Sequence, residues 1–197
     1  DLVRLATALD VKPQCVIGHS FGGKVALTYG CLRPDGLHHI WSLDSDPGPT
    51  KQETVSEITA VMETIRTAPM PVRHRLALRR HFDGAGFPRA IGDWMTTNLR
   101  PTPEGYVWAL DMDIIEEMLA DYRGVDAWTF IEDTQRTCAL HFLLAGRSSW
   151  WRGGVRNRLE QCKGVAHALL PSAGHWIHID DPDGMLDTGS VQIIDTP

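Results

Sequence analysis

The sequence has no apolar run that approaches the roughly 20 residues a helix needs to cross a bilayer, so we expect no membrane span. It also lacks an excess of positive charge, since 19 Lys and Arg stand against 25 Asp and Glu, for a net charge of −6. Nucleic-acid binding normally needs a basic face, so we expect no nucleic-acid partner. With 197 residues, 43% of them hydrophobic, the chain is long enough to bury a hydrophobic core without disulfides or metal ions to stabilise it.

Cysteines are few, and no C-x-x-C pair occurs among the four of them. This usage favours free thiols in a reducing compartment, so we predict a cytoplasmic protein. Nothing in the sequence indicates its oligomeric state. The chain begins at Asp1 within a helical pattern, and we expect the natural N-terminus to be missing.

Short apolar runs alternate with helical patterns along most of the chain. The runs predict buried strands at 15–17, 37–43, 139–145 and 166–170, with helices near 24–31 and 151–161. Strands separated by helices imply an α/β fold with a parallel sheet and right-handed crossovers.

The segment 50–136 interrupts this alternation. Apolar residues recur there at helical spacing, and no strand pattern is convincing. We therefore predict three parts: core sheet at 1–49, an all-helical cap insertion at 50–136, and core sheet at 137–197.

A G-x-S-x-G motif, Gly18 to Gly22, follows the first predicted strand and precedes a helix. Such a strand-to-helix turn holds a serine clear of the sheet, which makes Ser20 the candidate nucleophile. Glycines two residues on either side let the neighbouring backbone pass without a Cβ clash. The Phe21 amide lies at the helix start, where N–H groups are unpaired, so it is the candidate oxyanion donor. The phosphate-binding glycine motifs are absent.

Among the nine histidines, His175 is the candidate general base. It follows the last predicted strand, at the carboxyl edge where parallel α/β sheets build their sites. Its place near the chain end also fits the order in which serine, acid and histidine follow one another along the chain in hydrolases built on such a sheet. His175 and His178 form H-x-x-H, but no third ligand stands at a diagnostic spacing, so we expect no metal.

The acid of the triad is harder to assign, because the loop after strand 139–145 contains no carboxylate. A serine stands there where Asp is usual. Asp44 ends the preceding strand at the same edge and is the candidate acid. Asp46, two residues further, and Asp113 in the insertion are the alternatives.

The chain resembles α/β-hydrolases of the abhydrolase-domain-11 and YbfF esterase group, over about residues 10–183. The resemblance is carried by GHSFGGK (18–24), LDSDP (43–47), Trp94 with NLRP (98–101), LLAGRSSWW (143–151) and LPSAGHWIHID (170–180). It implies a partial α/β-hydrolase fold, a parallel sheet with a helical cap insertion, and acyl hydrolysis without a metal or organic cofactor. It supports Asp44, although some members are described with an acid in the insertion, near Asp113.

Two features depart from this family. Its first strands and the His-Gly loop that supplies a second oxyanion donor have no counterpart here, and 181–197 lacks a strong apolar face for the usual final helix.

We predict a serine hydrolase that cleaves a small carboxylic ester or thioester through an acyl-enzyme. Phe21, Trp94 and Trp176 are the candidate substrate-pocket residues. The alternative is a non-catalytic or truncated α/β-hydrolase-like binding module, whose exposed sheet edge would pair with another chain.

Overall fold

The computed structural model describes residues 1–50, 56–148, 151 and 154–194. Two compact units can be distinguished: Asp1–Thr50 with Tyr122–Pro197, and Lys51–Asp121. Among the described residues, no helix combines the length and apolarity that a membrane crossing requires.

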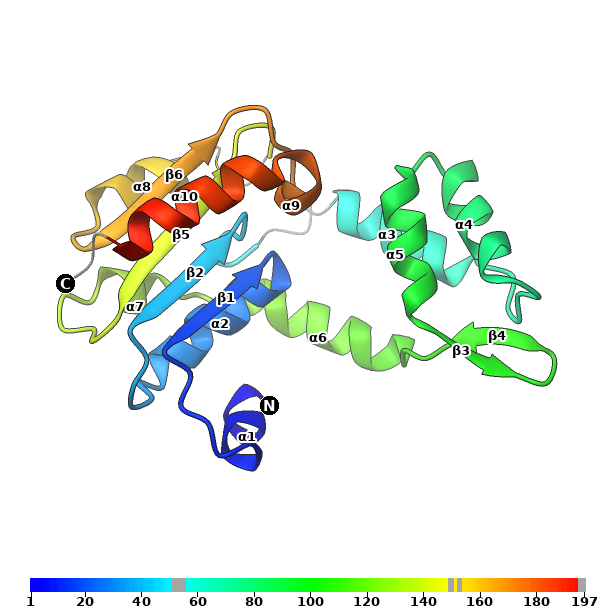
Figure 1. Cartoon of the computed structure of the whole chain (residues 1–197), viewed down its shortest axis with the longest axis horizontal. Coiled ribbons are helices and arrows are strands. Elements are labelled where there is room, and N and C mark those ends of the chain that lie inside the picture. The colour runs from blue at the N-terminus through cyan, green and yellow to red at the C-terminus, as the bar shows by residue number, and fades with distance from the viewer. Residues whose placement is uncertain (51–55, 149–150, 152–153, 195–197) are drawn as a thin grey trace. The chain divides into compact units, whose positions relative to one another are not determined.

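The first unit is built on a four-stranded sheet in the order β1-β2-β5-β6, all parallel, as Figure 1 shows. The predicted parallel α/β sheet is confirmed. The strands are β1 (Cys15–His19), β2 (His39–Leu43), β5 (Ala139–Ala145) and β6 (Val165–Leu170).

Helices cover both faces of this sheet because successive strand residues point to opposite sides. The described helices of this unit are α1 (Leu2–Ala8), α2 (Phe21–Cys31), α7 (Trp128–Glu132), α8 (Val155–Gln161), α9 (Ile177–Asp180) and α10 (Pro182–Ile194). Ile40, Leu140 and Phe142 point into a core shared with α2, α7 and α8. Leu143 and Ala145 point the other way, into a smaller core shared with α9 and α10.

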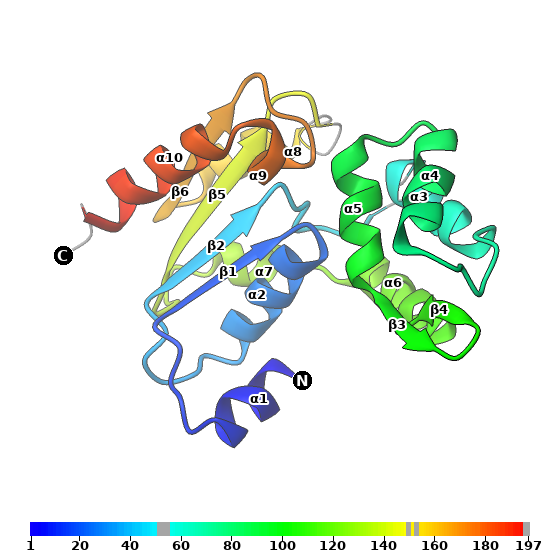
Figure 2. The same cartoon turned by 45° about the vertical axis from the view of Figure 1, so that its right-hand side comes forward.

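Most of the segment 181–197, in which the sequence shows no strong apolar face, forms the last helix, α10, and its Met185 packs against the smaller core. Figure 2 shows α10 running along the sheet beside β6.

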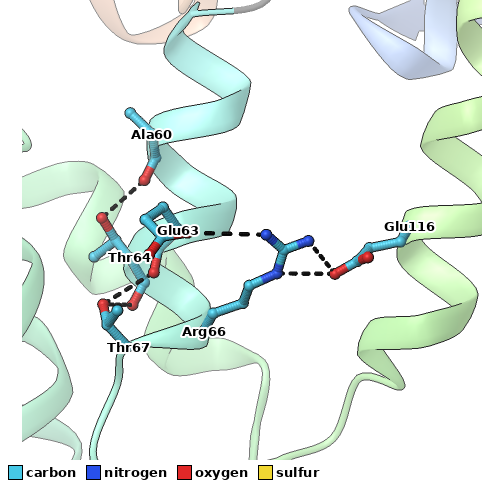
Figure 3. Close-up of polar contacts among 6 residues, drawn as sticks. All are labelled: Ala60, Glu63, Thr64, Arg66, Thr67 and Glu116. Carbon is cyan, nitrogen blue, oxygen red and sulfur yellow. Dashed lines mark hydrogen bonds and ion pairs between the residues drawn. The ribbon is translucent and has the colours of Figure 1, made fainter.

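The second unit contains α3 (Ser56–Arg66), α4 (Arg75–Gly84), α5 (Arg89–Thr97) and most of α6 (Met112–Gly124). Leu78, Phe82 and Ile91, on α4 and α5, are fully buried. Arg66 of α3 donates from Nε to Glu116 of α6 at 2.9 Å, as Figure 3 shows. This exposed ion pair adds little to stability.

Two predictions for the insertion are wrong. It is not all helical, since β3 (Leu99–Thr102) and β4 (Gly105–Trp108) form an antiparallel hairpin. Its strands are only four residues long and include Pro101, a residue that argues against a strand except at an edge. The insertion also ends at Asp121 rather than at 136, because α7 contributes its buried side chains to the core of the first unit.

Candidate active site

The turn between β1 and α2 presents Ser20 at the carboxyl edge of the sheet. Ser20 precedes the first residue of α2 and has a φ of 53° and a ψ of −117°, which a non-glycine residue rarely adopts. Its backbone N–H donates to the Leu43 carbonyl at 2.9 Å, which ties the turn to the end of β2. This strained strand-to-helix turn is the geometry that the G-x-S-x-G motif predicts.

The glycines around this turn differ in how closely other atoms approach them. A Cβ on Gly18 would lie 1.9 Å from the Gly22 carbonyl oxygen, whereas a Cβ on Gly22 would meet nothing within 4 Å. The second close approach is at Gly23, where a Cβ would lie 2.5 Å from Ser45 Cβ. The predicted close approach at Gly22 is therefore wrong, and it occurs one residue later, at Gly23.

Three side chains from three different strand ends meet at this edge. His175 Nε2 lies 2.9 Å from Ser20 Oγ, and His175 Nδ1 lies 2.8 Å from Asp44 Oδ2. Because a carboxylate only accepts, Nδ1 carries the imidazole proton and Nε2 accepts from the serine hydroxyl. Ser20 follows β1, Asp44 follows β2 and His175 lies beyond β6, so the parallel sheet itself brings them together.

Asp44 is wholly buried, and its side chain accepts N–H groups at both oxygens. The Ala145 amide donates to Oδ1 at 3.1 Å, and the Trp151 indole donates to the same oxygen. Asp44 itself has a φ of 42°, a left-handed conformation that aspartate tolerates better than most residues. The alternative Asp46 instead accepts the Gly48 amide at 2.9 Å, and Asp113 is an exposed residue of α6 in the second unit.

The loop that carries His175 is held by its neighbours. His19 Nε2 donates to the His175 carbonyl at 2.6 Å, and burial, the main cause, lowers the pKa of His19 to about 4. Asp180 accepts the Gly174 amide at 2.6 Å, and Arg147 pairs with the same oxygen at 3.1 Å. A neutral His19 and the Asp180 carboxylate therefore fix the backbone on either side of the imidazole.

Phe21 and Trp176 lie next to these three side chains. Phe21 is the first residue of α2, so its amide belongs to the N–H groups that a helix leaves unpaired. Its ring stacks on Tyr122 at a centroid distance of 5.4 Å. The Trp176 ring lies 5.5 Å from that of His175. Trp94 is on α5 of the second unit, with 49% of its surface exposed, and its pocket role stays a prediction.

A buried cation behind the serine turn was missed in the sequence analysis, which considered Lys24 only as part of a phosphate motif. Lys24 is 2% exposed, and its Nζ donates to the carbonyls of Gly48 at 2.6 Å and Tyr122 at 2.9 Å. Burial lowers the pKa of Lys24 to about 8. Gly48 and Tyr122 stand close to where the chain leaves and re-enters the first unit, so Lys24 ties α2 to both of these points. The sequence feature that could have predicted this role is a lysine directly after the G-x-S-x-G-G run, on a helix that is otherwise apolar.

The described residues contain no group of three or more His, Cys, Asp or Glu side chains arranged to hold a metal ion. The serine, imidazole and carboxylate described above lie together at this edge. A parallel α/β sheet that presents them in this order defines the α/β-hydrolase class.

Comparison with known proteins gives the same result. A family model described as the alpha/beta hydrolase family matches residues 1–188, and the chain belongs to this family. It is 26% identical over 193 residues to the mouse (Mus musculus) sn-1-specific diacylglycerol lipase ABHD11, covering 95% of this chain and 61% of that protein. Esterase YbfF of Escherichia coli (strain K12) is 23% identical over 192 residues, covering 94% of this chain and 69% of that protein.

Solved structures share the fold. A marine microorganism esterase superposes with a TM-score of 0.81 at 19% identity, covering 96% of this chain and 74% of that chain. E-2-(Acetamidomethylene)succinate hydrolase gives a TM-score of 0.79 at 16% identity, covering all of this chain and 72% of that chain. The chain spans only 57–61% of the length of the diacylglycerol lipase relatives from mouse and zebrafish (Danio rerio).

Proposed function

We propose that this chain is the catalytic part of a serine hydrolase that cleaves carboxylic esters or thioesters through an acyl-enzyme. The observation that carries the proposal is the continuous hydrogen-bond path from Ser20 Oγ through the His175 ring to Asp44. Membership of the alpha/beta hydrolase family and relatives named as an esterase and a lipase support it.

In this mechanism, Ser20 Oγ attacks the substrate carbonyl carbon while His175 Nε2 takes the hydroxyl proton. The negative charge moves to the carbonyl oxygen, where the Phe21 amide at the start of α2 donates a hydrogen bond. Collapse of the intermediate breaks the bond to the leaving alcohol or thiol, which receives the proton from His175. Water, deprotonated by His175, then attacks the acyl-enzyme and releases the acid and Ser20.

Asp44 keeps the imidazole in the tautomer that can accept the serine proton, and it stabilises the imidazolium that forms. Phe21 and Trp176 are the proposed substrate-contact residues in this unit. The name of the mouse relative places acylglycerol esters among the candidate substrates. No metal or organic cofactor takes part in these steps.

The test is hydrolysis of a short-chain p-nitrophenyl ester by the full-length gene product, together with labelling by a fluorophosphonate probe. We expect the wild type to turn over the ester and to be labelled, and Ser20→Ala to do neither. Ser45→Ala is the matched control, because it removes a buried hydroxyl from the adjacent loop and should retain labelling. Unchanged turnover by Ser20→Ala would rule out the mechanism. A folded wild type that is neither active nor labelled would favour a binding module.

A further inference from the structure

The loop after β5 contributes to the site in a way that the sequence did not indicate. It supplies no carboxylate between 146 and 150; residues 149–150 lie outside the described part of the chain. Trp151, just beyond, instead points its indole Nε1 at Asp44 Oδ1 at 2.5 Å. The Ala145 amide at the end of β5 donates to the same oxygen.

These two donors fix how the carboxylate is rotated. With Oδ1 held by two N–H groups, Oδ2 is left to face His175 Nδ1 at 2.8 Å. Asp44 has no exposed surface on its side chain, so these N–H groups replace the water that would otherwise solvate its charge. Removing the indole N–H would leave the buried carboxylate one donor short and its orientation less firmly held.

The Trp151 ring is itself anchored. It packs against the larger core cluster, which contains Phe142, Leu144 and Leu159 from β5 and α8. Core packing therefore sets the place of the indole N–H, and the indole N–H sets the orientation of Asp44. Without the indole, Oδ1 would keep only the Ala145 amide, at the longer distance of 3.1 Å, so this oxygen would be held less firmly.

We propose that Trp151 is a positioning residue of this site. It acts through Asp44: its N–H holds the acid so that the acid holds the His175 tautomer. The inference rests on the proposed function, and it adds a residue that touches neither Ser20 nor the substrate carbonyl in the steps above.

Two substitutions separate the N–H from the bulk of the ring. In Trp151→His, the imidazole Nε2 occupies the place of the indole Nε1, so a donor is kept while the benzo ring is lost. In Trp151→Phe, most of the aromatic bulk is kept and the donor is lost. Trp108→Phe is the matched control, because Trp108 is a partly buried tryptophan of β4 in the second unit.

The experiment measures kcat and KM for a short-chain p-nitrophenyl ester with the full-length gene product. We expect Trp151→Phe to lower kcat about tenfold, equivalent to about 1.4 kcal/mol, with KM within about twofold. Trp151→His should retain more of kcat than Trp151→Phe, and Trp108→Phe should match the wild type. If the ring serves only to pack, the order reverses, since the smaller and more polar histidine is then the worse replacement, and the proposal is overturned.

A double-mutant cycle provides the second readout. In an Asp44→Ala background the indole has no carboxylate to orient, so adding Trp151→Phe should change the residual kcat by less than about twofold. A full tenfold further loss would show that Trp151 acts independently of Asp44 and would overturn the proposal. Ser20→Ala separates failure of the proposed function from failure of this inference. Hydrolysis that survives Ser20→Ala would contradict the proposed function. If Ser20→Ala is inactive but Trp151→Phe has a kcat equal to or higher than that of Trp151→His, only the role of Trp151 is contradicted.

Discussion

Replacing Asp44 with asparagine changes one atom in a buried site, and its effect can be worked out from the hydrogen bonds. Oδ1 of Asp44 accepts two N–H groups, from Ala145 and Trp151, and Oδ2 accepts the Nδ1–H of His175. An asparagine has one oxygen and one NH2 group to place in these two positions. Putting the NH2 group against the two N–H donors would leave both without an acceptor, at about 1–3 kcal/mol each.

The oxygen of the introduced asparagine therefore stays with Ala145 and Trp151, and its NH2 group faces His175. The Nδ1 atom must then accept, which moves the imidazole proton to Nε2, opposite Ser20 Oγ. An imidazole protonated at Nε2 cannot take the serine proton. In a Ser-His-Asp triad this tautomer error lowers kcat by about 10⁴, or about 5.5 kcal/mol in the barrier.

The assay is steady-state hydrolysis of a p-nitrophenyl ester, with thermal unfolding to verify that the variants fold. We expect Asp44→Asn to lose about 10⁴ in kcat with KM nearly unchanged. Asp46→Asn, in the same loop, and Asp113→Asn, in the insertion, should each stay within about threefold of the wild type. Loss of activity in Asp113→Asn, with Asp44→Asn still active, would refute the reasoning and place the acid in the insertion.

Three further predictions concern the surroundings of Ser20. Gly23→Ala should lower the free energy of unfolding by about 1–3 kcal/mol, because the added Cβ would overlap Ser45. Gly22→Ala, whose Cβ would meet nothing within 4 Å, should leave the free energy of unfolding unchanged. Equal losses in the two variants, measured by denaturant unfolding, would contradict this reasoning. Folding lowers the pKa of Lys24 to about 8, so above that pH the unfolded chain binds one proton more than the folded chain. The free energy of unfolding therefore rises with pH. Between pH 7 and 10 the wild type should gain about 2 kcal/mol in this free energy relative to Lys24→Met. A flat difference across that range, measured by urea unfolding, would argue against a lowered pKa of Lys24 in the folded protein. His19→Ala should lower kcat about tenfold by releasing the His175 carbonyl, and His19→Gln, which keeps an N–H donor, should lose less; the same loss in both would exclude that role.

The parallel sheet was predictable from the sequence, and the sequence also singled out Ser20 and His175 as candidate site residues. Each depends on a local pattern: apolar runs between helices, glycines around a strand-to-helix turn, and a histidine just beyond a strand. Such patterns are readable because parallel strands bring their carboxyl ends to one edge, wherever the strands stand in the sequence. Asp44 was the favoured acid for the same reason, since it follows β2, which lies between β1 and β5.

The side chains that surround Ser20, His175 and Asp44 could not be predicted from the sequence and became visible in the three-dimensional structure. Trp151 and Ala145 meet Asp44 more than 100 positions away in the sequence, and Lys24 meets Tyr122 across 98 positions. The β3–β4 hairpin and the end of the insertion at Asp121 likewise depend on pairing and burial between distant segments. A residue's periodicity shows which face is apolar, but it does not show which donor a buried carboxylate will find. That depends on the three-dimensional packing, which brings together groups that no local pattern connects.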